Sequence, residues 1–451
     1  MENLNEGETE KRLRDFLQQI GKVLRNKKQR ACFAGYATGL LGNAERKSAE
    51  PMAALLWPDP DELDAAHQRL LHFVGQADWQ DSAVRSIAAR YALDAMTRRE
   101  PVQSWICDDT GFLKQGKHSV GVQRQYTGSA GKVTNCQVGA SLTFATQTMH
   151  LPVDFELYLP HSWADDPTRR AEAKIPNDVQ FRTKPQLALA MIDRALSAEL
   201  PKGTVLADAS YGNNGNFRVG LRQRGLSYAV DIEGSTKVRP MQRTGRLGTP
   251  VCVRDLALSL GIRAYRRVRW REGSKQTLWS NFARLRVAVE RDCRKLGKRE
   301  TLWLLAEWPD DESLPTKFAL LTAPKHTALD RLVRISRQRW RTERAYEDLK
   351  GELGLDHYEG RRFRGWHHHV TIALCCYAFV AAEHARSFPP TARRPRPSRT
   401  DRRPTGTSLR GLPHHGPARG RTHPRSLASS VPRMPPSTSS PSPFPAQIVT
   451  Q

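Results

Sequence analysis

The fold is decided by four consecutive segments, PQLALAMIDRALSAEL (185–200), GTVLADASYG (203–212), GNFRVGLRQRG (215–225) and LSYAVDI (226–232). The first and third carry apolar residues at the three-to-four-residue spacing of a helix. The second and fourth are short apolar runs, as in buried strands, and the second reaches an acid at Asp208. Alternating helices and strands predict an α/β fold.

Three strand patterns lie upstream of these segments: SWICDD (104–109), TNCQVGASLTFAT (134–146) and MHLPVDFELYLP (149–160). Each is rich in β-branched and aromatic residues, with Gly and Pro near its ends. Three strands in succession indicate a meander. The resulting order, βββαβαβ, is that of a ribonuclease H-like catalytic core.

We expect this core to comprise residues 101–236 and 323–386. A β-rich insertion over residues 237–322 interrupts it, with strand patterns that include VCVRDLALSL (251–260) and TLWLLAEW (301–308). One helix should follow the insertion, from about Ala328 to Leu353.

The balance of charge differs from that of an ordinary metabolic enzyme. The formal net charge is +25 and the isoelectric point is near 10.2, which favours a polyanionic partner, nucleic acid first and an anionic membrane second. No run of about 18 apolar residues exists, and the first residues do not form a signal peptide pattern. The seven cysteines lack the CxxC spacing of a zinc site and fit a reducing cytosol. We expect a cytoplasmic protein with no membrane partner.

The two ends of the chain differ from the core. Residues 1–100 have apolar residues such as Leu13, Phe16 and Ile20 at helical spacing among many Arg and Lys, which predicts a helical, basic, DNA-binding domain. Residues 387–451 are rich in Pro, Arg, Ser and Thr and have no apolar periodicity. We expect a disordered tail there, and its abrupt start suggests a frameshift near residue 387.

Three acids are positioned for phosphodiester chemistry. Two divalent ions held by carboxylates can activate a nucleophile and stabilise the leaving oxygen of such a reaction. In a ribonuclease H-like core the acids belong on the first strand, at the end of the fourth strand and on a helix that packs against the sheet. Asp109, Asp208 and Glu343 match these positions and are the predicted catalytic and metal-binding residues.

Glu343 lies on a basic stripe of the late helix. Arg339 precedes it by four residues and Lys350 follows it by seven, so all three side chains share one face. A solvated helix often has this charge pattern as well. The two acids at strand ends favour the functional interpretation.

The chain resembles the DDE transposases of bacterial insertion sequences, in the branch with a Tyr-Arg-Glu-Lys signature on the helix of the last acid. Arg339, Glu343 and Lys350 match the signature, whereas its Tyr position is Ser336 here. Longer matches are DDTGFLKQGKHSVGV (108–122), LADASYG (206–212) and GELGLDHYEGRRFRGWHHH (351–369). The resemblance covers roughly residues 25–385.

The resemblance implies two Mg²⁺ or Mn²⁺ ions per active site, held by the three acids. It also implies that Arg339 and Lys350 contact DNA phosphates. Trp340 could stack on a displaced base or anchor its helix. Asp108 is the alternative first acid, because neighbouring side chains of a strand point to opposite faces. We choose Asp109 because the family pattern has the metal-binding acid directly before Thr.

Other polar clusters allow two interpretations each. Lys114 and Lys117, in the loop after Asp109, are candidate DNA-binding residues or parts of a basic hairpin turn. The consecutive residues His367, His368 and His369 point in different directions, which favours polar packing or phosphate contact over a shared metal ion.

The predicted function is that of an insertion-sequence transposase, which cuts double-stranded DNA at terminal inverted repeats and transfers the strand into target DNA. Pairing of two ends implies a homodimer, and the substrate implies association with the bacterial nucleoid. Two alternatives remain open: a catalytically silent DNA-binding product of a decayed element, and a ribonuclease H-like nuclease without strand transfer.

Overall fold

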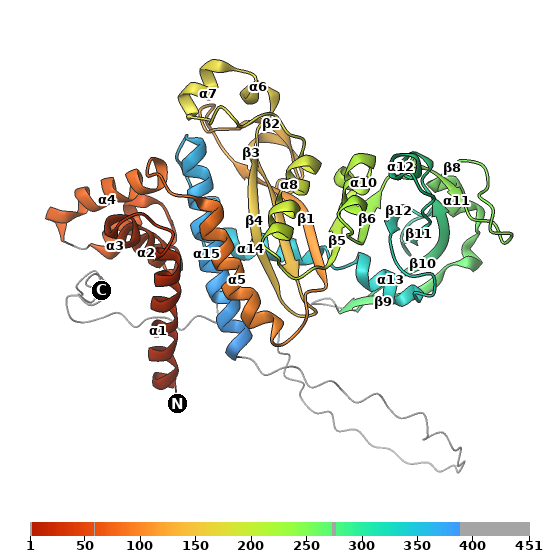
Figure 1. Ribbon diagram of the computed structural model, residues 1–451, viewed down its shortest axis with the longest axis horizontal. Coiled ribbons are helices and arrows are strands. Elements are labelled where there is room, and N and C mark those ends of the chain that lie inside the picture. The colour runs from red at the N-terminus through yellow and green to blue at the C-terminus, as the bar shows by residue number, and fades with distance from the viewer. Residues whose placement is uncertain (1, 58, 273–276, 388–451) are drawn as a thin grey trace, which may run out of the picture.

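The computed structural model describes residues 2–57, 59–272 and 277–387 (Figure 1). The predicted tail therefore lies outside the described residues, except for Ser387. The first part of the chain is helical. Its helices are α1 (Glu2–Gly21), α2 (Lys27–Leu41), α3 (Ala49–Leu56), α4 (Pro60–Gly75) and α5 (Asp81–Thr97).

Local chemistry sets the starts of two of these helices. The side chains of Asn26 and Asp59 cap α2 and α4 by accepting hydrogen bonds from backbone N–H groups of the first turn. Pro60 then occupies the first position of α4, where a missing N–H costs nothing.

The described strands form one mixed sheet. Its order is β2-β3-β1-β5-β6-β12-β11-β10-β7-β8, with β4 paired to β3 and β9 paired to β10. The strands of the predicted core are β1 (Ser104–Leu113), β2 (Gln123–Thr127), β3 (Lys132–Ala145), β4 (His150–Tyr158), β5 (Thr204–Ala207) and β6 (Tyr228–Ile232). β1 pairs antiparallel with β3 and parallel with β5, and β5 pairs parallel with β6. The predicted α/β character is confirmed.

Helices connect β4 to β5 and β5 to β6. These are α6 (His161–Ala164), α7 (Pro167–Ala173), α8 (Lys184–Ser197), α9 (Ala209–Gly212) and α10 (Gly215–Gln223). Thr183 and Gln186 form a capping box at the start of α8.

The last described helix packs against helices from the beginning of the chain. α15 (Phe363–Ser387) packs along α5 and against β4, between the first helices and the sheet (Figure 1). Phe16 of α1 stacks on Phe379, and Arg12 pairs with Glu383. One cluster of buried apolar side chains extends from α1 through the sheet to α15. Because residues 1–100 share this cluster with the rest of the chain, the structure does not delimit a separate domain there, and that domain stays a prediction.

The segment predicted as an insertion extends the same sheet. Its elements are β7 (Lys237–Pro240), β8 (Val251–Cys252), α11 (Val253–Ser259), η1 (Ile262–Ala264), β9 (Arg266–Glu272), β10 (Thr277–Ala288), α12 (Glu290–Leu296), β11 (Leu302–Trp308) and β12 (Lys317–Leu321). β12 pairs antiparallel with β6 and so connects it to the core strands. The prediction of a strand over 251–260 was wrong after Cys252. Val253, Leu256 and Ala257 are buried at helical spacing in α11.

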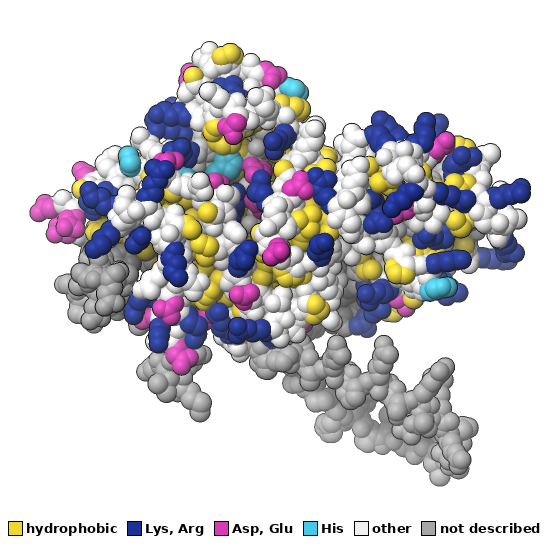
Figure 2. Space-filling model, in the orientation of Figure 1, with side chains coloured by type: hydrophobic (Ala, Val, Ile, Leu, Met, Phe, Trp, Pro, Cys, Tyr) yellow, Lys and Arg dark blue, Asp and Glu magenta, His cyan; other side chains and the backbone are white. Residues whose placement is uncertain are grey.

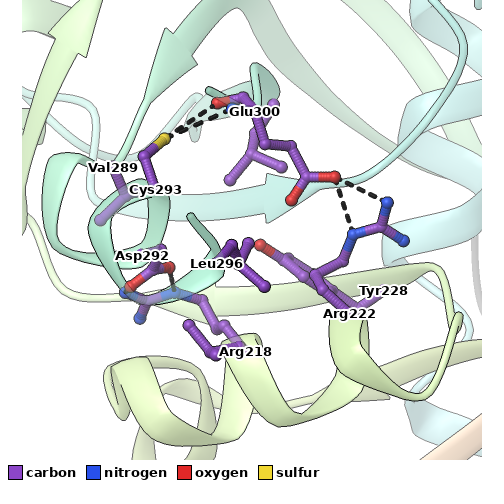
Figure 3. Close-up of a pocket in the computed structure, with 10 residues that line it drawn as sticks. Arg218, Arg222, Tyr228, Val289, Asp292, Cys293, Leu296 and Glu300 are labelled. Carbon is purple, nitrogen blue, oxygen red and sulfur yellow. Dashed lines mark hydrogen bonds and ion pairs between the residues drawn. The ribbon is translucent and has the colours of Figure 1, made fainter. Parts of the chain in front are cut away.

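Two ion pairs join α10 to this part of the chain (Figure 3). Arg218 forms a bidentate pair with Asp292 of α12, with N–O distances of 2.7 and 2.9 Å, and both side chains are buried. Arg222 pairs with Glu300, at 2.6 Å.

The late helix is interrupted, contrary to the prediction of one helix over 328–353. α13 (Leu329–Ser336) and α14 (Trp340–Gly351) are separated by a turn at 337–339. Arg337 pairs with Glu307 of β11, whereas Arg339 pairs with Asp108 of β1. No helix in the described ranges is both long enough and apolar enough to cross a membrane.

Candidate active site

The register of β1, β5 and β6 orders the side chains above the sheet. Ile106 of β1 is paired with Leu206 of β5, which is paired with Ala229 of β6. We call these three residues the apolar row. All three are buried in one cluster with Leu332 and Val333 of α13. α13 therefore covers this face of the sheet.

An acid follows each member of the apolar row by two residues, in β1, directly after β5 and in β6. Asp108, Asp208 and Asp231 follow the three members of the apolar row at the period of two that returns a side chain to its face. Neighbouring strands are about 4.8 Å apart. We call these acids the carboxylate row.

α14 packs against the same face. The hydroxyl groups of Ser141 on β3 and Tyr346 on α14 are hydrogen bonded at 2.5 Å, and those of Thr143 and Thr342 at 3.0 Å. Since Ser141 is the register partner of Asp108, the helix that carries Glu343 lies over the face of Asp108.

Asp109 points the other way. Its register partner is Ala140, and its carboxylate accepts a hydrogen bond from Lys184 of α8 at 2.9 Å. Cys107 precedes it by two residues and is buried, and by alternation along β1 both residues lie on the face opposite Ile106. The acid chosen from the sequence thus does not share a face with Glu343, whereas its alternative, Asp108, does.

Arg339 connects the acids of this site. Its guanidinium donates to Asp108 at 2.7 Å and lies 3.6 Å from Glu343. Burial lowers the pKa of Arg339, but attraction to Asp108, Asp231, Asp208 and Glu343 outweighs burial and raises it. One cation therefore interacts with the carboxylate row and with the acid of α14.

The acids differ in environment. Burial raises the pKa of Asp108 to about 7 against the opposing effect of Arg339, and it raises the pKa of Asp231 against Arg337 and Arg339. Asp208 caps α9, because its Oδ1 accepts hydrogen bonds from the N–H and hydroxyl of Ser210.

Glu343 is the most open member of the site, with its side chain 59% exposed. Carboxylate oxygens are the donors that Mg²⁺ and Mn²⁺ prefer, so the residue types fit these ions. Within the described ranges, however, no three acidic, His or Cys side chains are close enough together to hold a metal. A bound ion would have to replace Arg339 as the positive partner of Asp108.

The predicted DNA-binding residues have different surroundings. Lys350 donates to the hydroxyl of Thr110 at 2.9 Å and to the carbonyl of Gly111, so it lies at the end of β1 beside the acids. Lys114 donates to a backbone carbonyl, that of Tyr358, whereas Lys117 is exposed. Trp340 is half-buried at the start of α14.

The three consecutive histidines of α15 are buried and face three partners. His367 lies 3.5 Å from Glu156, and His368 has backbone carbonyls within hydrogen-bond distance of both ring nitrogens. His369 is hydrogen bonded to the hydroxyl of Tyr36 and faces the carbonyl of Gly354. These contacts agree with the interpretation as polar packing.

Asp231 was missed from the sequence. It is the last but one residue of the apolar strand pattern LSYAVDI, much as Asp208 is the last residue of TVLAD, and that parallel was the available signal. The N–H of Gly212 donates to the carbonyl of Asp208 at 2.8 Å. A Cβ on Gly212 would meet the carbonyl oxygen of Asp231 at 1.9 Å, so the turn after Asp208 lies against β6.

Comparison with known proteins adds family evidence. Residues 15–277 match the family described as DDE superfamily endonuclease, and residues 177–379 match the transposase DDE domain. A relative from Microchaete diplosiphon, described as a probable transposase for insertion sequence element IS701, is 28% identical over 206 residues. The match covers 46% of this chain and 49% of that relative, so the chain spans about half the length of the curated relative.

Proposed function

We propose, from the premise that this chain belongs to the DDE superfamily endonuclease family, that it is the transposase of a bacterial insertion sequence. Its reaction would be cleavage of double-stranded DNA at terminal inverted repeats, followed by transfer of the strand into target DNA. The observation that carries the proposal is the Arg339 guanidinium, which interacts with acids of three separate elements, β1, the end of β5 and α14.

The proposed acids are Asp108, Asp208 and Glu343. Asp108 replaces Asp109 in this proposal, because Asp108 shares the sheet face that α14 covers and Asp109 pairs with Lys184 on the other face. These acids would hold two Mg²⁺ or Mn²⁺ ions. The ions would activate the nucleophile and stabilise the negative charge on the leaving oxygen.

The cations of the site have a second role in this proposal. Arg339 neutralises the acids in the protein as described, and it becomes available for a DNA phosphate once other positive charge replaces it. The second phosphate contact is Lys350 of α14, which is hydrogen bonded to Thr110 of β1. The exposed Lys117, in the loop after β1, is a third. Trp340 is the candidate for stacking on a displaced base.

Other parts of the proposal concern partners. Basic side chains are spread over this face of the molecule, on the first helices and on the strands beyond β6 (Figure 2). We infer that the first helices read the inverted repeat, that two copies of the chain pair the two ends, and that the protein acts at the nucleoid.

The test is cleavage of a labelled duplex that carries the inverted repeat from the DNA flanking the gene, with Mg²⁺ or Mn²⁺. The parent protein is compared with Asp108→Asn, Asp109→Asn and Glu343→Gln, each of which keeps the shape of the side chain. We expect nicking at the repeat boundary by the parent and by Asp109→Asn. We expect a loss of at least about 100-fold for the other two variants, the order of effect for an essential electrostatic group.

Each other result has a definite meaning. Cleavage that is lost in Asp109→Asn and retained in Asp108→Asn would reverse the assignment of the first acid. Binding without cleavage by the parent would favour the silent DNA-binding product, for which the pairing of Arg339 with Asp108 is the supporting observation. Cleavage without strand transfer would favour a nuclease.

A further inference from the structure

A cleft of about 770 Å³ opens at the other end of the strands that carry the acids. It is lined by the segments that begin β1, β5 and β6, by Gln147, and by one side of α13 together with Gln338. The next residue after Gln338 is Arg339, so the cleft and the candidate active site adjoin along the chain.

The floor of the cleft belongs to the face of the carboxylate row. Ser104, Thr204 and Ser227 line the cleft, and each lies two residues before a member of the apolar row. By the period of two, these hydroxyl-bearing residues and the carboxylate row share one face, with the apolar row between them. The span from Thr204 to Asp208 is four residues, or about 13 Å along a strand.

The charge of the cleft is positive. Its cations are Lys202, Arg331 and Arg334, all exposed, and no acid is among the described residues that line it. These three side chains form no hydrogen bond or ion pair with the described part of the chain. Arg331 and Arg334 are one helical turn apart on α13, and Lys202 approaches from the start of β5.

This combination suits an extended anion rather than a compact one. The cations come from two elements, and the neutral donors between them are hydroxyl and amide groups, which bind phosphate oxygens without discriminating between bases. One DNA strand carries a phosphate about every 3.4 Å of helix axis. Because α13 covers the apolar row, a strand would pass around α13, and its phosphates in the cleft would lie at least about four nucleotides from the reacting bond.

We propose that the cleft binds the phosphodiester backbone of DNA on the far side of α13, a few nucleotides from the bond that reacts. The proposal rests on the proposed function in one respect, namely that DNA is the substrate. It adds a second site of backbone contact, which the signature residues Arg339 and Lys350 do not include.

The test measures binding of a fluorescein-labelled duplex of unrelated sequence, by anisotropy, between about 50 and 200 mM salt. A triple variant neutralises the cleft, and a matched triple variant removes two Arg and one Lys from exposed positions outside it. The cleft variant is Lys202→Gln, Arg331→Gln and Arg334→Gln, and the control is Arg124→Gln, Lys132→Gln and Arg182→Gln.

We expect the cleft variant to lower the slope of log affinity against log salt by about 2 to 3, because each lost phosphate contact removes about 0.9. Between about 50 and 200 mM salt, the factor by which its affinity decreases should then be about 40 times smaller than the factor for the parent. The control should change the slope by less than about 1. The single variant Lys202→Gln, in a loop, should lower the slope by about 0.9 and does not depend on the packing of α13.

Either of two results would overturn the proposal: slopes equal to that of the parent for both cleft variants, or an equal loss in the control. The readout requires no cleavage, so it separates this site from the catalytic proposal. A parent that binds with a steep slope but does not cut DNA would refute the catalytic assignment and leave the cleft supported by the difference between the triples.

A second experiment determines whether the DNA in the cleft is the element's own end or the target DNA. Cleavage at the inverted repeat and strand transfer into a plasmid are measured separately for the cleft variant. Loss of cleavage would assign the cleft to the element's own end. Loss of transfer alone would assign it to target DNA. If both activities remain at the level of the parent, the cleft is not a site of backbone contact in the reaction.

Discussion

Replacing Asp292 by Ala should destabilise the protein by about 3 to 5 kcal/mol, because it leaves the guanidinium of Arg218 buried without its counterion. The side chains are only 5% and 7% exposed, and two N–O contacts of 2.7 and 2.9 Å join them. Among the described residues, the carbonyl of Gly212 would be the remaining hydrogen-bond partner of Arg218. Since Asp292 lies on α12, the variant should weaken the packing of α12 against α10 (Figure 3).

The assay is urea unfolding followed by tryptophan fluorescence. A matched control is Asp193→Ala, which breaks the pair with Arg224, also bidentate at 2.6 and 2.7 Å, but with Asp193 51% exposed. That variant should lose less than about 1 kcal/mol. The double variant Arg218→Met, Asp292→Leu should recover most of the loss, because no unpaired charge stays buried. Equal losses for Asp292→Ala and Asp193→Ala, or no recovery in the double variant, would refute the reasoning.

Three further predictions concern stability. Gly212→Ala should cost about 1 to 3 kcal/mol in urea unfolding, since its Cβ would meet the carbonyl of Asp231 at 1.9 Å, whereas Gly351→Ala, with open space around it, should cost nothing. Burial lowers the pKa of His150 to about 3, below about 6.5 when unfolded, so the stability it contributes above pH 6.5 is lost as pH falls toward 3. When the pH falls from 7 to 5, the free energy of unfolding of His150→Leu should therefore decrease by about 1 to 2 kcal/mol less than that of the parent. Identical decreases in the two proteins would contradict this. Thr183→Ala should lose about 1 kcal/mol by removing the capping box of α8, and an unchanged urea midpoint would argue against that role.

The sequence predicted the core strands because their apolar runs are bounded by turn residues. It failed at α11, where Val251 and Val253 begin a segment that looks β-like, although Leu256 and Ala257 complete a helical face. The break at 337–339 could not be foreseen either, because Arg337 in it pairs with Glu307 of β11, which is 30 residues away in the sequence.

For the site, alternation along β1 established that only one of two adjacent acids could face the helix of Glu343. It could not say which, because β1 is buried on both faces and its sequence shows no polar side. The choice between Asp108 and Asp109 depends on the register with β3 and β5, which is a tertiary property. Asp231 was overlooked for the same reason, since its place beside Asp208 follows from strand pairing.

The packing of α15 against the first helices also has a consequence for the order of folding. Phe16 and Phe379 are 363 residues apart in the sequence, yet their rings stack with centroids 5.8 Å apart. At about 5 to 20 residues per second, a ribosome needs roughly 20 to 70 s to synthesise the chain between them. During that time, the apolar face of α1 has no partner from α15. The bundle that the first helices form with α15 can therefore assemble only late in synthesis.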